Sequence, residues 1–179
     1  MELTEVILVD ANDQPIGTRE KMEAHELGLL HRAFSIFIFN TKGEMLLQQR
    51  ALNKYHSGGL WTNACCSHPL PGEQTLNAAQ RRLKEELGFE ATIGKIFDFV
   101  YKADMGNGLT EHEFDHVFAG EYEGAINLNK EEAMDFCYRN IKEIGQDLRS
   151  YPQKYTVWFH MAFPRIEEWW NTQYRDKVA

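Results

Sequence analysis

The pattern of apolar and polar positions in the first third of the chain predicts three strands and one helix. Residues 5–9 are mostly apolar and predict a strand, and the turn-rich residues 10–17 end it. A short helix is expected over residues 19–29. Residues 33–39 are apolar on nearly every position, which is typical of a central strand with both faces buried. A short polar turn joins them to residues 45–49, and the two segments are predicted to form a hairpin.

The clearest helix is predicted over residues 75–87. Its apolar positions recur at helical spacing, and they are Leu76, Ala79, Leu83 and Leu87. Gly88 follows as a stop signal. Three more strands are predicted over residues 95–102, 110–122 and 136–139.

The sequence pattern of the C-terminal part predicts helices. Pro164, inside residues 156–170, is expected to break or kink one of them. Strands with interspersed helices, and no linker or repeat, predict a mixed α/β (α+β) sheet with flanking helices. A length of 179 residues with 43% hydrophobic content is enough for one full core. We therefore expect a single domain over residues 1–179.

Charge and cysteine content narrow the function classes. The formal charge of −8 and the lack of a Lys/Arg stripe argue against a nucleic-acid partner, although a small anion can still be bound locally. Three cysteines, two of them adjacent, form no disulfide framework and suggest a reducing cytoplasm. The first residues have no basic region followed by a long apolar run, so no signal peptide is expected, and no segment is expected to span a membrane.

Residues 61–69 (WTNACCSHP) contain a thiol and an imidazole two residues apart. In an extended segment, Cys66 and His68 point to one side and Cys65 points to the other. A reactive site and a pair of packing cysteines are the two interpretations, because free cysteine is often part of the core.

Histidines and carboxylates elsewhere form a second candidate group. In the strand over residues 110–122, alternation places Glu111 and Glu113 on one face and His112 and His116 on the other. Adjacent carboxylates are consistent with an exposed acidic edge or with a metal site, whereas the two histidines lie among phenylalanines and are expected to be packing residues. A larger set of three imidazoles and two carboxylates suits a divalent cation such as Mn²⁺ or Zn²⁺, the alternative being unrelated surface histidines: His25, His31, His68, Glu111 and Glu113.

Charged pairs on the predicted helix have both a structural and a functional interpretation. Arg81 and Arg82 precede Glu85 and Glu86 by four residues, a spacing that also forms ordinary surface ion pairs worth about 0.2–0.5 kcal/mol each. Basic residues on short connections can instead neutralise a substrate anion despite the acidic total. These residues are Lys21, Arg50 and Lys54.

Taken together, these residues resemble the type I isopentenyl-diphosphate Δ-isomerases, a branch of the Nudix superfamily, across almost the whole chain. The segment over residues 62–69 (TNACCSHP) is similar to the isomerase signature, and residues 67–89 resemble a Nudix box. Two positions depart from the hydrolase pattern: Ser67 replaces a glycine and Arg82 replaces a glutamate. Loss of that acidic metal ligand argues against pyrophosphohydrolase activity.

The resemblance implies a Nudix fold and a cytoplasmic enzyme of isoprenoid biosynthesis that converts isopentenyl diphosphate to dimethylallyl diphosphate. It implies Cys66 and Glu113 as the acid/base pair, with Tyr101 and Trp158 as aromatic site residues. The implied ligands of one metal, Mn²⁺, Zn²⁺ or Mg²⁺, are His25, His31, His68, Glu111 and Glu113. Glu86 would hold a Mg²⁺ on the diphosphate. The implied phosphate contacts are Lys21, Arg50, Lys54, Ser67 and Arg82.

This chemistry needs two groups that move protons, because the terminal alkene carbon gains a proton and the neighbouring methylene loses one through a tertiary cation. The face of the Trp158 ring can stabilise such a cation, although the same residue also suits a helix core. The alternatives are a Nudix pyrophosphohydrolase and a non-catalytic diphosphate-binding module, neither of which needs a thiol beside its metal histidine. A monomer or weak homodimer is expected.

Overall fold

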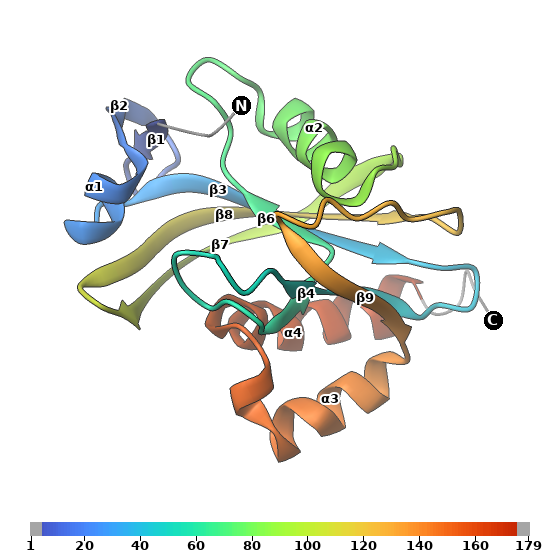
Figure 1. Cartoon of the computed structure of the whole chain (residues 1–179). Coiled ribbons are helices and arrows are strands. Elements are labelled where there is room, and N and C mark those ends of the chain that lie inside the picture. Colours follow the sequence, from blue (N-terminus) through green and yellow to red (C-terminus); the bar gives the residue numbers. More distant parts are fainter. Residues whose placement is uncertain (1–4, 175–179) are drawn as a thin grey trace.

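Nine strands form one mixed sheet through the middle of the molecule (Figure 1). The structure is a computed structural model that describes residues 5–174, so both ends of the expected domain 1–179 lie outside the described residues. The strands are β1 (Glu5–Val9), β2 (Pro15–Glu20), β3 (His31–Phe39), β4 (Met45–Arg50), β5 (Trp61–Asn63), β6 (Cys65–Ser67), β7 (Ile93–Gly106), β8 (Leu109–Glu121) and β9 (Ala133–Arg139).

Strand β3 is the centre of the sheet. Its residues pair with β6 in the antiparallel direction and with β8 in the parallel direction, and Ser35 is opposite Cys66 on one edge and Val117 on the other. The predicted hairpin between β3 and β4 is correct at its turn, but the two strands pair only at Phe39 and Met45. Strand β4 then leaves β3 and pairs with β5 and β9. A long strand that is apolar on both faces is thereby paired on both edges by strands distant in the sequence.

Helices cover the two faces of the sheet (Figure 1). Helix α2 (Thr75–Leu87) covers one face, and α3 (Ile141–Ser150) and α4 (Val157–Trp169) cover the other. Two hydrophobic cores result: Phe34 and Ile36 pack with residues of α2, whereas Phe37 and Phe39 pack with residues of α3 and α4. The alternation along β3 thus supplies both cores, and the predicted mixed α/β architecture is confirmed.

Helix α2 has the predicted bounds. Gly88 ends it with a φ of 74°, and a Cβ there would lie 2.7 Å from the backbone oxygen of Asn127. Only glycine combines this left-handed conformation with so close an approach. One predicted apolar position differs, because Leu76 is exposed in the first turn.

The segment before β3 differs from the prediction. Strand β2 occupies residues assigned to a turn and to the start of a helix, and helix α1 spans only Lys21–Glu26. Every residue of β2 is exposed, because it is an edge strand paired only with β1. An edge strand with no buried face carries no alternation of apolar and polar residues, so the sequence pattern did not reveal it.

Of the break or kink expected at Pro164, the break does not occur, because the helix is continuous there. Helix α4 runs from Val157 to Trp169 with Pro164 inside it. Phe159, Phe163 and Ile166 are buried on this helix, and their burial offsets the one backbone hydrogen bond that proline removes. Within residues 5–174, no helix is long and apolar enough to cross a membrane.

Candidate active site

A single cavity gathers most of the predicted site residues. The predicted residues that line it are Lys21, Arg50, Lys54, Cys66, Ser67, His68, Arg82, Glu86, Tyr101, Glu111, Glu113 and Trp158. His25 and His31 do not line the cavity but contact it through Glu111 and Glu113. The cavity wall is much more polar than the two cores beside it.

Strands β3 and β8 extend beyond the hydrophobic core, and the strand face that points into the core at one end points into the site at the other. Phe37 and Val117 face the core formed with α4. Nearer the start of the two strands, the residues of the same parity include the polar residues His31 and Ser35 of β3 and Glu111, Glu113 and Asp115 of β8. There, His31 is opposite Glu113 in the β3–β8 register. The same two strands therefore carry the apolar core at one end and the site at the other.

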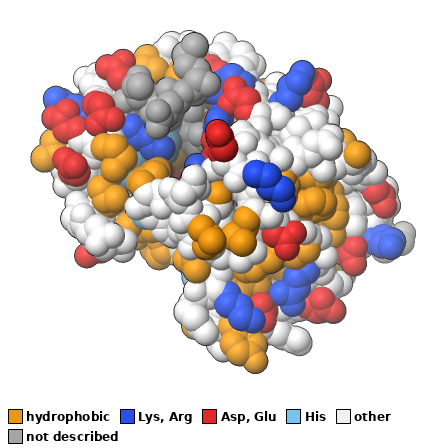
Figure 2. All heavy atoms as spheres, viewed as in Figure 1, with side chains coloured by type: hydrophobic (Ala, Val, Ile, Leu, Met, Phe, Trp, Pro, Cys, Tyr) orange, Lys and Arg blue, Asp and Glu red, His pale blue; other side chains and the backbone are white. Residues whose placement is uncertain are grey.

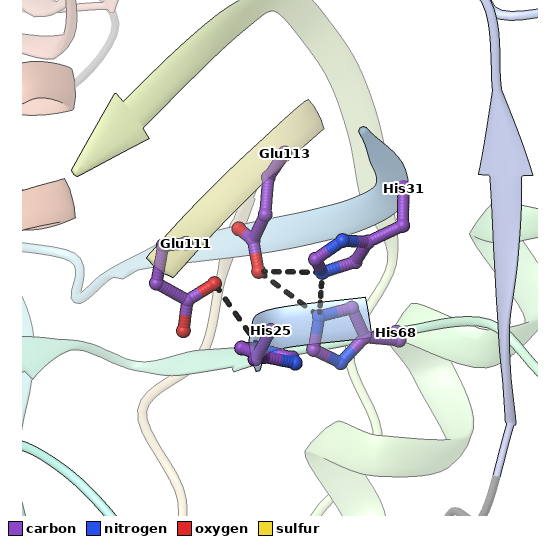
Figure 3. Close-up of side chains that lie close together, drawn as sticks. All are labelled: His25, His31, His68, Glu111 and Glu113. Carbon is purple, nitrogen blue, oxygen red and sulfur yellow. Dashed lines mark hydrogen bonds and ion pairs between the residues drawn. The ribbon is translucent and has the colours of Figure 1, made fainter. Parts of the chain in front are cut away.

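Five side chains converge in a buried cluster (Figure 3). Each offers a ligand atom, and these atoms all lie within 4.8 Å of one another: His25 from α1, His31 from β3, His68 after β6, and Glu111 and Glu113 from β8. The Nε2 atoms of His31 and His68 are 3.2 Å apart, and Glu113 Oε1 lies 2.9 Å from His68 Nε2. The set predicted as a metal site is one spatial group.

The orientation of the rings suits metal binding. His25 Nδ1 donates to the Lys21 carbonyl (2.6 Å), and His31 Nδ1 donates to the Leu29 carbonyl (2.8 Å), so both Nε2 atoms point into the cluster. Backbone acceptors of this kind fix the tautomer of metal-ligating histidines. Nε2 of His25 and Oε2 of Glu111 are buried without a hydrogen bond in the described part of the chain. Such unsatisfied polar atoms are costly unless a cation pairs with them.

Burial decides the ionisation of His68, and contacts with histidines decide that of Glu111. It lowers the pKa of His68 to about 3, so this imidazole is neutral and its lone pair is available. Burial raises the pKa of Glu111, but contacts with His25 and His56 outweigh this effect and hold the pKa well below its usual range. Neutral imidazoles and ionised carboxylates are the ligand forms that divalent metals bind.

The buried cluster also decides whether Glu111 and Glu113 of β8 form an exposed acidic edge or a metal site. Glu111 and Glu113 are buried, so the interpretation as an exposed acidic edge is wrong. His112 is half-buried and donates to the Gly28 carbonyl, and His116 contacts Asp13. Both histidines lie outside the cluster, as predicted.

The two adjacent cysteines have opposite surroundings. Cys65 is part of the core formed with α2, whereas Cys66 lines the cavity, which confirms the predicted alternation. The Cys66 thiol donates to Asn63 Oδ1 (3.0 Å) and lies 3.4 Å from the Ser35 hydroxyl, which in turn donates to Asp115 (2.7 Å). Burial raises the pKa of Cys66, so the thiol is protonated at neutral pH.

Glu113 has partners on both carboxylate oxygens. Tyr101 donates its hydroxyl proton to Oε2 at 2.6 Å, and His68 Nε2 lies 2.9 Å from Oε1. Glu113 and Cys66 lie on β8 and β6, the two strands that pair with opposite edges of β3. The carboxylate and the thiol thus line one cavity from two sides of the central strand.

Basic residues form another part of the cavity wall. Arg82 contacts Glu85, Glu86 and Glu132 at 2.8 to 2.9 Å, and Lys54 also contacts Glu132. These two cations hold the pKa of Glu132 at about 2 against the effect of burial. Arg81 on the same helix contacts Glu73 and Glu85 and does not line the cavity.

Aromatic rings hold two other cations of the cavity. The Arg50 guanidinium lies 5.1 Å from the Trp158 ring, and the Lys21 ammonium lies 4.5 Å from the Tyr55 ring. Burial lowers the pKa of Lys21, and the neighbouring Lys54 adds to this.

Several residues of the cavity were missed at the sequence level. They are Gln48, Tyr55, His56 and Glu132 in the wall, and Ser35, Asn63 and Asp115 around Cys66. The one available signal was alternation, because Asp115 follows Glu111 and Glu113 on the same face of β8. Tyr55, His56 and Glu132 lie outside regular elements, where no period predicts a direction.

Comparison with known proteins identifies the relatives of the chain. Residues 29–159 match the NUDIX domain family. An isopentenyl-diphosphate Delta-isomerase of Pectobacterium atrosepticum is 49% identical, and the match covers 96% of both chains. The isopentenyl-diphosphate Delta-isomerase of Serratia proteamaculans is 51% identical over 86% of both chains.

Solved structures share the fold at much lower sequence identity. A Deinococcus radiodurans protein matches with a TM-score of 0.68 at 15% identity, over 82% of this chain and 90% of that one. A MutT protein from Methanosarcina mazei Go1 matches with a TM-score of 0.64 at 20% identity, over 78% of this chain and 94% of that one. These likenesses concern the fold alone.

Proposed function

The chain belongs to the NUDIX family and, within it, to the isopentenyl-diphosphate Delta-isomerases, and on this premise we propose the roles of the residues in its buried cavity. The enzyme converts isopentenyl diphosphate to dimethylallyl diphosphate. This reaction moves a double bond and breaks no phosphate bond, so the site must move two protons while it holds the diphosphate.

Cys66 and Glu113 are the acid/base pair. The observation that carries this assignment is that a thiol and a carboxylate line the same cavity from the two strands beside β3. One group protonates the terminal alkene carbon and the other removes a proton from the neighbouring methylene. The two exchange roles when the reaction runs in reverse, so the proposal assigns the pair and not its direction.

The surroundings of each group suit proton transfer. Asn63 Oδ1 accepts a hydrogen bond from the Cys66 thiol, and two backbone carbonyls, those of Ile36 and Cys65, hold the Asn63 amide in this orientation. Tyr101 donates a hydrogen bond to Glu113 Oε2 and fixes the position of that carboxyl group. Both groups are therefore held in defined positions before substrate enters, which reduces the entropic cost of reaching the transition state.

The His/Glu cluster would hold one divalent metal, for which we propose Mn²⁺, Zn²⁺ or Mg²⁺. Bound there, the cation would supply positive charge next to Glu113 and stabilise its carboxylate. The protein residues contribute the fixed geometry: the backbone carbonyls that orient His25 and His31, and the β3–β8 register that sets His31 opposite Glu113.

The basic wall of the cavity would bind the diphosphate. Lys21, Arg50, Lys54 and Arg82 provide positive charge, and Ser67 provides a hydroxyl in the same cavity wall. Glu86 is buried on α2, and burial raises its pKa while Arg82 counteracts this. We propose that Glu86 helps to hold a Mg²⁺ on the diphosphate.

Trp158 would stabilise the tertiary cation between the two proton transfers. It is buried at the start of α4, lines the cavity and is stacked against Arg50. Cation–π attraction in a desolvated site contributes about 2 kcal/mol. Such stabilisation acts on the charged intermediate and not on the neutral alkene, so it lowers the barrier.

The experiment that tests this function is isomerisation in deuterated water. The purified protein is incubated with isopentenyl diphosphate and Mg²⁺, and the products are analysed by mass spectrometry and NMR. We expect dimethylallyl diphosphate with deuterium in a methyl group, and no label above background with Cys66→Ala. Release of inorganic phosphate or pyrophosphate without a labelled isomer would instead identify a hydrolase.

A further inference from the structure

His56 lines the cavity but has no role in the mechanism described above. It lies in the loop between β4 and β5 and is only 8% exposed. Its Nε2 atom is 2.7 Å from Oε1 of Glu111. The other oxygen of the same carboxylate, Oε2, lies 3.4 Å from Nε2 of His25 in the metal cluster. Glu111 is thus contacted by one imidazole from inside the cluster and by a second from outside it.

The two ring nitrogens of His56 have different neighbours. Nδ1 lies 3.2 Å from the Ser57 hydroxyl, which can donate a proton to it. When Nδ1 accepts this bond, the ring proton is on Nε2, which is buried 2.7 Å from Glu111 Oε1 but makes no well-aligned hydrogen bond in the described part of the chain. This close contact occupies the Oε1 side of the carboxylate and leaves Oε2, 3.4 Å from His25 Nε2, directed toward the cluster.

The loop holds His56 in place. Its backbone carbonyl accepts a hydrogen bond from Arg50 Nη2 at 3.2 Å, and its ring contacts Trp158 edge-on with a centroid distance of 5.8 Å. A Cβ at Gly58 would lie 2.5 Å from the backbone oxygen of Leu52, so the loop is too tightly packed there for any other residue. His56 is therefore a fixed part of the cavity wall and not a mobile surface histidine.

We propose that His56 is a positioning residue that holds the Glu111 carboxylate in its metal-binding orientation. The inference rests on the proposed function, because it takes the His/Glu cluster to be the metal site. Residues that orient a metal ligand from outside typically contribute 10- to 100-fold, as an order of magnitude, to metal affinity. His56 also contacts Trp158 and Arg50, so one residue connects the metal cluster to the aromatic and basic parts of the cavity.

The test compares side chains that place a donor at different distances from the backbone. In glutamine the amide nitrogen reaches about as far as Nε2 of histidine, whereas in asparagine it reaches only as far as Nδ1. The protein is stripped of metal with a chelator and titrated with Mn²⁺ alone, and free Mn²⁺ is measured by electron paramagnetic resonance. We expect His56→Asn and His56→Phe to weaken Mn²⁺ binding by about 10- to 100-fold, and His56→Gln to stay near wild type.

Two further variants separate the possible failures. Asn53→Ala changes an exposed residue of the same loop and should bind Mn²⁺ like wild type. His68→Ala removes a cluster ligand and should lose the site. If His68→Ala loses Mn²⁺ but His56→Asn binds it like wild type, the metal site stands and the role of His56 is wrong. If His68→Ala binds like wild type, the cluster is not the metal site and both proposals fail.

A kinetic measurement adds a readout that general destabilisation would not reproduce. The backbone carbonyl of His56, and not its side chain, holds Arg50. We therefore expect His56→Asn to lower kcat much more than it raises KM for isopentenyl diphosphate, with His56→Gln restoring kcat. Equal losses in the Gln and Asn variants, with both proteins folded by circular dichroism, would contradict a role for the Nε2 contact.

Discussion

At the scale of single residues, Cys65 and Cys66 show how one step along a strand changes the function of a side chain. Cys65 is enclosed by the core formed with α2, and Cys66 faces the cavity. We expect Cys66→Ala to lower kcat by at least about 10²-fold, the usual contribution of a positioned acid or base, with the fold and the metal content unchanged. Cys65→Ala should keep most of its activity.

Steady-state kinetics and elemental analysis of both variants test this prediction. Cys65→Ala serves as the matched control, since it removes the same atom from the neighbouring position. Equal residual activity in the two variants would mean that the face assignment does not determine the catalytic group.

A comparison of His68 with the two histidines of β8 provides a second prediction at this scale. His68 lies inside the cluster, whereas His112 and His116 lie outside it with partners of their own. We expect His68→Ala to be purified without the cluster metal, and His112→Ala and His116→Ala to keep it. Elemental analysis after gel filtration measures the stoichiometry, and a full complement of metal in His68→Ala would remove this residue from the ligand set.

At the scale of elements, helix α2 carries two neighbouring arginines with different environments. Arg82 lines the cavity and contacts Glu86 and Glu132, whereas Arg81 contacts Glu73 and Glu85 outside it. We expect Arg82→Ala to raise KM for isopentenyl diphosphate by 10-fold or more, on the order of 1.4 kcal/mol, because a charged hydrogen bond to phosphate is lost. Arg81→Ala should change KM little, because an exposed ion pair contributes at most about 1 kcal/mol to stability and does not touch substrate.

Glu86 on the same helix tests the second metal. We expect Glu86→Gln to shift the activity curve to higher Mg²⁺ concentration while the His/Glu cluster stays occupied, because Glu86 lies with the basic residues and outside the cluster. Activity is titrated against Mg²⁺ for wild type and variant, with Arg81→Ala as the control on the same helix. Superimposable curves would rule out a Mg²⁺ role for Glu86.

At the scale of the whole molecule, Glu132 connects three segments that are far apart in the sequence. Glu132 lies directly before β9, and its carboxylate contacts Arg82 of α2 and Lys54 of the β4–β5 loop. Its pKa is about 2 in the folded protein, below the value of about 4.3 for a free glutamate. A lowered pKa adds stability above the unfolded pKa, and this contribution disappears as the pH falls toward 2.

We therefore expect Glu132→Gln to be less stable than wild type at pH 6, by about 1 kcal/mol or more. The difference in free energy of unfolding should shrink as the pH falls below about 5. Urea unfolding of both proteins at several pH values measures it. A difference that is constant from pH 6 to pH 3 would show that the Glu132 charge does not contribute.

The charge of the molecule is arranged differently at the surface and in the cavity. Lys and Arg side chains are interspersed with Asp and Glu over the face shown in Figure 2, and no stripe of one sign covers it. The four basic residues Lys21, Arg50, Lys54 and Arg82 instead line the cavity of a chain with a net charge of −8. Attraction for a diphosphate is thus a property of the cavity and not of the total charge.

Local patterns were sufficient for much of the fold and for part of the site. The helix over residues 75–87 was predicted with its observed bounds, because its apolar spacing and Gly88 are local signals. The opposite faces of Cys65 and Cys66 followed from the two-residue period of a strand. The resemblance to a known family supplied the ligand set, which spacing alone left open.

The sequence by itself therefore determined the main elements, the faces of the site strands and the family of the enzyme, because each is written in short-range patterns or in a motif. Only the tertiary structure decided which strands flank β3, that Glu111 and Glu113 are buried, and that β2 exists as an exposed edge. Only it placed His56 against Glu111 and Glu132 between Arg82 and Lys54. These contacts join residues from loops and distant strands, and no local period sets their direction, since the packing of the whole chain brings them together.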